Sequence, residues 1–213
     1  MSRALIIAGT DTDVGKTVVA AGLVRCIPDA LYWKPVQAGL DPMRDTQRAQ
    51  HLSGLPDQHF LPEAYSLNTP ASPHLAARID GVVVDPDRLA LPQVPAPLIV
   101  ESAGGVMVPL TDTFLNIDMF ARWGMPVILV ARTTLGTINH SLLTLSALRA
   151  RDIPVGGIIF SGDAHEENER VIPRLSGVRS LGRLPHLDSL DASSLHRAMH
   201  AHIDIEAIGA LVQ

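Results

Sequence analysis

The chain has 213 residues, of which 46% are hydrophobic, and this is enough apolar material to bury the core of a domain. Because 17 basic residues stand against 22 acidic ones, a net charge of -5, general electrostatic attraction to nucleic acid or to an anionic membrane is excluded. The single cysteine, Cys26, excludes an internal disulfide framework and a multi-cysteine metal site, and we expect it to be a small buried apolar residue on a helix.

Short β-branched runs alternate along the chain with longer segments whose apolar residues have helical spacing. Strands are predicted, in chain order, at residues 5–8, 30–33, 98–101, 127–131 and 157–161. Helices are predicted between and after them at residues 16–26, 45–52, 116–123, 139–150 and 166–175. This alternation predicts an α/β fold of the doubly wound type, with a mostly parallel sheet flanked by helices.

Residues 85–97 contain four prolines and are predicted to be a surface connection within a single domain that spans residues 1–213. The longest apolar stretches, such as residues 20–24 and 127–131, fall far short of the roughly 20 residues that a membrane-spanning helix needs. The first apolar run, residues 5–8, is also too short for a secretory signal. We therefore expect a cytoplasmic location and no membrane partner.

A glycine-rich loop follows the first predicted strand and opens the first predicted helix. Its sequence from Gly9 to Thr17 is GTDTDVGKT, a variant of the phosphate-binding pattern G-x-x-x-x-G-K-[ST] in which Thr10 takes the place of the first glycine. Such a loop directs backbone N–H groups and a helix N-terminus at a phosphate chain, and Gly15 lets the backbone approach closely. We expect Lys16 to meet the β- and γ-phosphates and Thr17 to offer a hydroxyl to Mg²⁺, as in a P-loop NTPase-like domain.

The basic positions of the chain are almost all arginine, because 15 Arg stand beside only two Lys, Lys16 and Lys34. A position that cradles phosphate needs a compact charge on a slim stem, which the wider guanidinium does not supply. Lys34 directly follows the strand predicted at residues 30–33 and should lie at the same carboxyl edge of the sheet as the phosphate loop. Both lysines are predicted to flank one transferred phosphoryl group, with a solvated strand end as the alternative for Lys34.

Two acidic residues are candidates for the carboxylates that Mg²⁺ takes at a nucleotide site. Glu101 closes a predicted buried strand and precedes Gly104 and Gly105, a position that core packing does not explain. Asp45 opens a predicted helix, where a metal ligand and an N-cap are equally consistent with the sequence.

Three histidines, His196, His200 and His202, stand at helical spacing near the end of the chain. No carboxylate accompanies them in the order that a catalytic zinc helix needs, so we expect an exposed helix face and no metal site there. The Gly-x-Ser-x-Gly motif of a serine nucleophile is absent from the sequence.

Several segments, in order along most of the chain, resemble the dethiobiotin synthetase family. They are GTDTDVGKT, YWKPVQAG at residues 32–39, SPH at 72–74, ESAGG at 101–105, PLTDTF at 109–114 and LGTINH at 135–140. That family closes the ureido ring of dethiobiotin from 7,8-diaminopelargonic acid, CO₂ and MgATP. The resemblance implies a ligase that works through a carbamate and a carbamic-phosphoric anhydride, releases ADP and phosphate, and needs no protein nucleophile.

The resemblance also implies roles for individual residues. The catalytic residues would be Lys16, Lys34, Thr12 and Asp13, with Thr12 and Asp13 facing the diamine and the carbamate. Mg²⁺ would be held by Thr17, Asp45 and Glu101. The ATP site would comprise Asp13, Val14, Gly15, Lys16, Thr17, Val18, Asp45, Glu101, Ser102, Ala103, Gly104 and Ser161. The organic substrate would be contacted by Thr12, Lys34 and Ala38 and, across the interface of a homodimer, by Thr137, Ile138 and Asn139 at a helix N-terminus that receives its carboxylate.

Four positions depart from the pattern of that family. Asp13 replaces the common glutamate, and Ala38 replaces a hydroxyl residue that can touch the substrate. Ser102 stands where glycine is usual, which matters if the backbone must come very close to the ligand. Ser161 replaces an asparagine expected to bind the adenine edge, so the sequence leaves the nucleotide preference open.

Two other functions share parts of this pattern. Enzymes of the cobyrinic acid diamide synthase type also activate a carboxylate with ATP, but they carry a further amidotransferase domain for which this chain is too short. Nucleotide-switched partitioning ATPases normally carry a second lysine within the phosphate loop and a basic surface or amphipathic tail, and neither is present. Asp204 and Glu206 argue against membrane anchoring of the C-terminal segment, and no nucleic-acid partner is expected.

Overall fold

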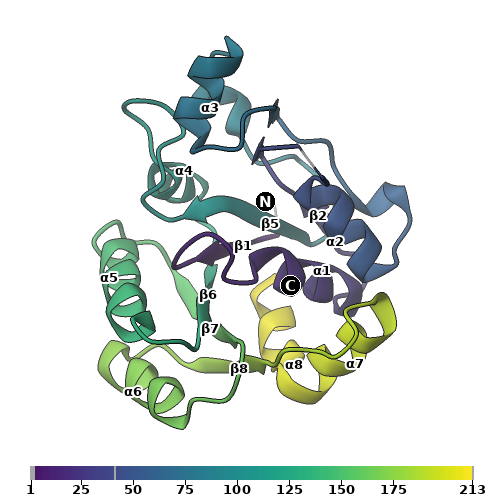
Figure 1. Ribbon diagram of the computed structural model, residues 1–213, viewed down its shortest axis with the longest axis vertical. Coiled ribbons are helices and arrows are strands. Elements are labelled where there is room, and N and C mark those ends of the chain that lie inside the picture. Colours follow the sequence, from purple (N-terminus) through teal and green to yellow (C-terminus); the bar gives the residue numbers. More distant parts are fainter. Residues whose placement is uncertain (1–2, 41, 213) are drawn as a thin grey trace.

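A six-stranded parallel sheet forms the centre of the molecule (Figure 1). The computed structural model describes residues 3–40 and 42–212. The strand order is β2-β5-β1-β6-β7-β8, and every pairing is parallel. The strands are β1 (Ala4–Gly9), β2 (Leu31–Trp33), β5 (Leu98–Gly105), β6 (Val127–Arg132), β7 (Val155–Ser161) and β8 (Ser180–Leu184). The predicted α/β fold with a parallel sheet is therefore confirmed.

Helices cover both faces of this sheet (Figure 1). One face packs against α1 (Lys16–Cys26), α2 (Asp45–Ser53), α7 (Ala192–His202) and α8 (Ile205–Gly209). The other packs against α3 (Pro73–Asp80), α4 (Asn116–Trp123), α5 (Thr137–Arg149) and α6 (Glu166–Ser176). Successive side chains of a strand point to opposite faces, so Leu5 and Ile7 join the first cluster while Ile6 and Ala8 join the second. Burial on both faces explains the continuous apolar runs of the strands.

Shorter elements complete the fold. A separate parallel pair joins β3 (Val36–Ala38) to β4 (Tyr65–Leu67), and three 3₁₀ helices lie at η1 (Asp57–His59), η2 (Pro86–Leu89) and η3 (Ala210–Val212). None of these was predicted, and neither were α3, β8 or α8. The three-residue strands β3 and β4, with the sequences VQA and YSL, lack the continuous apolar run that indicated β2. Within the proline-rich segment 85–97, η2 is the only helix or strand that the structure assigns.

Several boundaries differ from the prediction. The strand predicted at residues 98–101 continues as β5 to Gly105, and the helix predicted at residues 139–150 begins as α5 two residues earlier, at Thr137. Cys26 is half-buried, where a buried residue was expected. His200 and His202 are exposed on α7 as expected, but His196 is half-buried against Cys26.

The register of the sheet sets the place of the site. β1 lies between β5 and β6 in the sheet. The strands β2 and β5 were added on one side of β1 and the later strands β6, β7 and β8 on the other, so the strand order reverses direction at β1. Ile7 pairs with Glu101 and Gly9 with Gly105, which brings the end of β1 and the end of β5 to one edge. Such a switch point at the carboxyl ends of parallel strands is where ligands bind in open α/β sheets.

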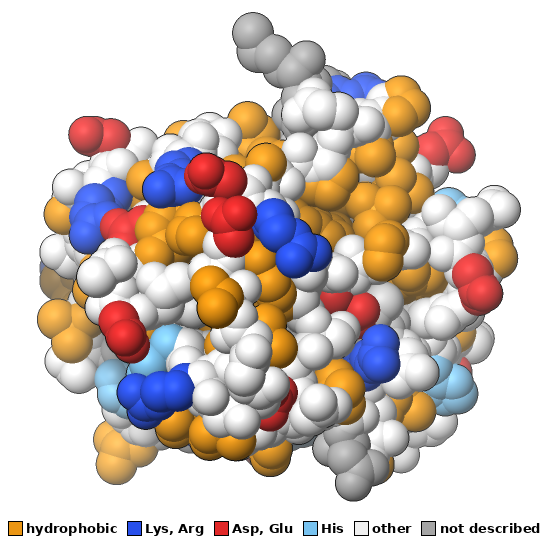
Figure 2. All heavy atoms as spheres, turned by 90° about the horizontal axis from the view of Figure 1, so that it is seen from above, with side chains coloured by type: hydrophobic (Ala, Val, Ile, Leu, Met, Phe, Trp, Pro, Cys, Tyr) orange, Lys and Arg blue, Asp and Glu red, His pale blue; other side chains and the backbone are white. Residues whose placement is uncertain are grey.

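The surface seen from the α3 end is mixed in charge. Basic side chains lie beside acidic ones on this face, with hydrophobic side chains between them (Figure 2). None of the helices that the structure describes is long and apolar enough to cross a membrane. The single domain over residues 1–213 and the cytoplasmic location stay predictions.

Candidate active site

The loop between β1 and α1 forms the floor of the site. Gly15, the N-cap of α1, has φ 99°, a conformation that side chains rarely adopt. A Cβ added to Gly15 would also lie 2.6 Å from the hydroxyl oxygen of Ser161. Only glycine therefore fits at this point, where the loop passes close to β7.

Lys16 begins α1 and is only 6% exposed. Its Nζ donates a hydrogen bond to the backbone oxygen of Asp11 at 2.8 Å, so the loop itself holds the ammonium group. Burial lowers the pKa of Lys16 to about 8, although the negative charge of Glu101 opposes this effect. The neighbouring carboxylates only partly offset the effect of burial, and a bound phosphate would stabilise the charged form further.

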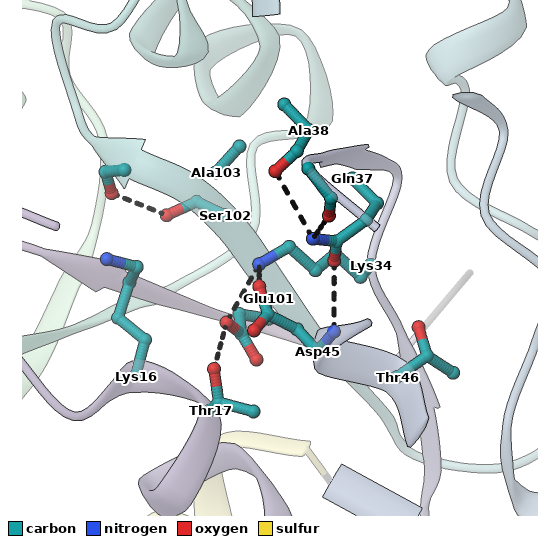
Figure 3. Close-up of polar contacts among 12 residues, drawn as sticks. Lys16, Thr17, Lys34, Gln37, Ala38, Asp45, Thr46, Glu101, Ser102 and Ala103 are labelled. Carbon is teal, nitrogen blue, oxygen red and sulfur yellow. Dashed lines mark hydrogen bonds and ion pairs between the residues drawn. The ribbon is translucent and has the colours of Figure 1, made fainter. Parts of the chain in front are cut away.

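Glu101 is the centre of a buried polar cluster at the end of β5. It is 1% exposed and accepts hydrogen bonds from Thr17 Oγ1 at 2.8 Å, from the hydroxyl of Tyr32 at 2.8 Å and from Lys34 Nζ at 3.0 Å. Lys34 extends between Glu101 and Asp45 and also forms an ion pair with Asp45 (Figure 3). Two carboxylates thus share one buried ammonium group.

The protonation states of this cluster follow from its burial and its charges. Burial alone would lower the pKa of Lys34, but the carboxylates of Glu101 and Asp45 outweigh it and raise that pKa, so Lys34 stays charged. Burial and the neighbouring charge of Glu101 raise the pKa of Tyr32 well above its usual value. Tyr32 is therefore a neutral donor that orients Glu101.

Three cavities meet along this edge of the sheet. The central one, of about 370 Å³, is lined by Lys16, Lys34 and Glu101 among others. It shares Thr12 and Lys34 with a second cavity of about 440 Å³, and it shares Asp13, Gly15, Val18 and Arg48 with a third of about 490 Å³. Because neighbouring cavities have walls in common, they form one cleft with both lysines in its middle section.

Most of the residues predicted for the site lie in this cleft. The central cavity is lined by Thr12, Asp13, Gly15, Lys16, Thr17, Val18, Lys34, Asp45, Glu101 and Gly104, the second also by Ala38 and Ala103, and the third also by Val14 and Ser161. The roles assigned to these residues stay predictions.

Four predicted residues lie outside it. Ser102 is 1% exposed, and its hydroxyl donates to the backbone oxygen of Gly104 at 3.5 Å instead of lining a cavity. Thr137, Ile138 and Asn139 form the start of α5 and line none of the three cavities. The substrate contact predicted for the start of α5 stays a prediction.

The N-cap alternative for Asp45 is wrong. The N-cap of α2 is Arg44, and Asp45 is the first residue of the helix. The backbone N–H of Asp45 donates to Gln37 Oε1 at 3.1 Å, while its carboxylate pairs with Lys34. Its side chain is therefore directed at the cleft and not at the turn that follows it.

Four residues of the site were not predicted. Tyr32 and Gln37 stand within the YWKPVQAG segment, so their position beside Lys34 was a usable signal. Arg48 lies one turn after Asp45 on α2, a spacing that places both on one helix face. Asn116 donates from Nδ2 to the backbone oxygens of Ala103 at 2.6 Å and Gly105 at 2.9 Å and so fixes the chain after β5; no local pattern indicated this contact.

Two solved structures with a similar fold carry the name ATPase in their titles. The chain aligns with the cell division ATPase MinD of Pyrococcus furiosus at a TM-score of 0.59 and 13% identity, over 99% of this chain and 100% of that one. It aligns with a ParA family ATPase of Chlorobium tepidum at a TM-score of 0.57 and 12% identity, over 94% and 98%. At this identity the likeness extends to the fold alone.

Sequence comparison is more specific. A family model described as an AAA domain matches residues 3–194. A protein of Rhodopseudomonas palustris strain BisA53 named ATP-dependent dethiobiotin synthetase BioD is 59% identical over 198 residues, which cover 93% of this chain and 92% of that protein. A protein of Brucella anthropi with the same name is 54% identical over 209 residues, 98% of each. The chain belongs to the ATP-dependent dethiobiotin synthetase family.

Proposed function

We propose that this chain is the ligase that closes the ureido ring of dethiobiotin from 7,8-diaminopelargonic acid, CO₂ and ATP, with release of ADP and phosphate. The observation that carries the proposal is that the only two lysines of the chain, Lys16 and Lys34, are both buried and line the same cavity beside Glu101. A reaction that develops charge on a transferred phosphoryl group needs such cations and no protein nucleophile.

ATP would lie along the phosphate loop. The phosphates would meet the N-terminus of α1 and Lys16, because the free N–H groups there attract anions. The nucleoside would extend into the cavity lined by Val14, Ser161 and Arg132, which adjoins the phosphate end. The hydroxyl of Ser161 can both donate and accept hydrogen bonds, so it is compatible with more than one nucleotide base. The nucleotide preference is measured by comparing turnover with ATP and with other nucleoside triphosphates.

Mg²⁺ fits the donor set in the middle of the cleft. Thr17, Asp45 and Glu101 offer one hydroxyl and two carboxylates, the hard oxygen donors that Mg²⁺ prefers beside phosphates. Bound there, Mg²⁺ would neutralise phosphate charge and orient the γ-phosphate. Lys34 forms ion pairs with the same two carboxylates, Asp45 and Glu101. These ion pairs hold its ammonium group within the proposed phosphate site.

The diamine would occupy the adjoining cavity. Its walls include Ala38, Pro70, Ala71 and Val108, which suit an apolar chain, and Thr12 and Lys34 stand where it opens toward the phosphates. The substrate carboxylate would reach the start of α5 in a second copy of the chain, at Thr137, Ile138 and Asn139. Two features support this seat: α5 has no side-chain cap, and the buried hydroxyl of Thr137 has no partner among the described residues.

The chemistry would proceed in three steps. One amine of the substrate adds to CO₂ and gives its proton to solvent, which leaves a carbamate that Thr12 and Asp13 face. A carbamate oxygen then attacks the γ-phosphorus of ATP and displaces ADP, while Lys16 and Lys34 stabilise the charge on the phosphoryl oxygens. The second amine attacks the carbonyl carbon of the resulting carbamic-phosphoric anhydride, expels phosphate, gives its own proton to solvent and closes the ring.

A coupled assay of ADP release tests this function. Purified protein should turn over ATP only when the diamine and bicarbonate are both present, and the organic product should be dethiobiotin by mass spectrometry. Turnover that needs DNA or lipid vesicles, and that ignores the diamine, would instead favour a nucleotide switch of the ParA or MinD kind.

Subunit mixing tests the shared substrate seat. Each site of the proposed two-fold homodimer takes Lys34 from one chain and Thr137 from the other. A dimer of two Lys34→Met chains, or of two Thr137→Arg chains, therefore has no intact site. A mixed dimer keeps one intact site, because one chain still supplies Lys34 and its partner still supplies Thr137. Random mixing of equal amounts should restore about a quarter of the wild-type activity. No recovery, with mixed dimers present by native mass spectrometry, would contradict a site built from two chains.

A further inference from the structure

A cysteine and two histidines meet where the end of α1 packs against α7, outside the cleft described above. Cys26 Sγ lies 3.6 Å from His196 Nδ1, and the ligand atoms of Cys26, His196 and His200 all lie within 4.8 Å of one another. The rings of His196 and His200 stand edge to face with centroids 4.6 Å apart, as residues one helical turn apart on α7 can.

Close packing of the two helices fixes this cluster. A Cβ added to Gly22 of α1 would lie 2.6 Å from Met199 Cγ on α7, so the helices touch at this point. Cys26 lies one turn beyond Gly22, and His196 lies one turn before Met199, which shows that the helices run in opposite directions. The ligand atoms are thus carried by rigid elements of the core and not by loops.

One separation in the cluster matches that of two ligands in a tetrahedral metal site. With a Zn–S bond of about 2.3 Å and a Zn–N bond of about 2.05 Å, tetrahedral geometry separates sulfur and nitrogen by about 3.6 Å. The separation of Cys26 Sγ and His196 Nδ1 is 3.6 Å.

We propose that Cys26, His196 and His200 bind a soft divalent transition metal, with Zn²⁺ as the expected ion and water as the fourth ligand. The thiol of Cys26 gives its proton to the solvent as the sulfur–metal bond forms. Exposed His200 leaves the fourth position open to water. The ion fastens α1 to α7, and because Cys26 is ten residues from Lys16, about 15 Å along α1, it does not enter the reaction.

Titration of tag-free, chelator-treated protein tests this site, with excess Mg²⁺ and ADP present to fill the cleft. Calorimetry should show one equivalent of Zn²⁺ bound, and Co²⁺ should give the near-ultraviolet charge-transfer band of a thiolate ligand. At a hundredfold excess of free Zn²⁺ over its Kd, the Tm should rise by about 5–10 °C. Turnover with saturating MgATP should stay within about twofold.

Matched variants separate this site from any other zinc site. Cys26→Ser and His200→Gln should each weaken Zn²⁺ binding at least about tenfold, and Cys26→Ser should abolish the cobalt band. The control is His202→Gln, on the same helix but outside the cluster, which should bind as the wild type does. Since His200 is exposed, its variant keeps the test valid even if Cys26→Ser folds poorly. Equal Zn²⁺ affinity in wild type and His200→Gln, or no binding to wild type, would overturn the proposal.

Discussion

Replacing Lys34 with methionine removes the cation that two carboxylates share. The side chains of Lys34 and Glu101 are 5% and 1% exposed, whereas that of Asp45 is 30% exposed. Removing one partner of a buried ion pair costs about 3–5 kcal/mol, and because water reaches Asp45 we expect the lower end, about 3 kcal/mol. For a chain of this size that corresponds to a fall in Tm of about 6–12 °C.

Thermal unfolding in a chelating buffer measures this loss, and Lys34→Arg is the matched control. Arginine keeps the charge, so its Tm should fall by less than half as much, but its wider head should misplace the phosphoryl group and lower turnover at least tenfold, about 1.4 kcal/mol. Mg²⁺ should raise the Tm of Lys34→Met more than that of wild type, because it neutralises the same carboxylates. A Lys34→Met protein with the wild-type Tm and turnover would refute the reasoning.

Three further predictions concern the phosphate and metal sites. Glu101→Gln should raise the Mg²⁺ concentration needed for half-maximal turnover at least about tenfold, and an unchanged metal titration would remove Glu101 from the site. Gly15→Ala should raise the KM for ATP or prevent folding, because its Cβ would lie 2.6 Å from Ser161 Oγ; wild-type ATP kinetics would contradict this. Burial lowers the pKa of Lys16 to about 8, so its charge is lost as the pH rises through that value, and the KM for ATP should rise over the same interval. A KM that stays constant through pH 8 would separate Lys16 from phosphate binding.

Local patterns were sufficient to predict five of the six strands of the main sheet and the phosphate loop. The five predicted strands all occur because a parallel strand buried on both faces has a short, continuous apolar run. Helix α1 begins and ends as predicted, at Lys16 and Cys26, since Gly15 precedes it and Ile27 and Pro28 follow it. The scarcity of lysine also selected Lys16 and Lys34, which the structure places in one cavity.

Contacts between distant segments were beyond these patterns. Tyr32 and Glu101 are separated by 69 positions, and Cys26 and His196 by 170, so neither pair forms a local motif. The sequence alone was equally consistent with a metal ligand and with an N-cap at Asp45. The ion pair that distinguishes them joins Asp45 to Lys34, which lies outside its helix. The sequence identifies chemical groups at the ends of strands and helices, but which of them meet depends on the register and packing of the whole sheet.

Oxygen isotope transfer tests the central claim most directly, namely that this chain joins ATP cleavage to a carbamate of its substrate. With CO₂ labelled with oxygen-18 and freshly mixed enzyme, diamine and ATP, the carbamate oxygen that attacks the γ-phosphorus leaves with that phosphorus. Mass spectrometry of the released phosphate should therefore find one labelled oxygen for each dethiobiotin formed. Phosphate whose new oxygen comes only from water would show that ATP is merely hydrolysed and would contradict the account.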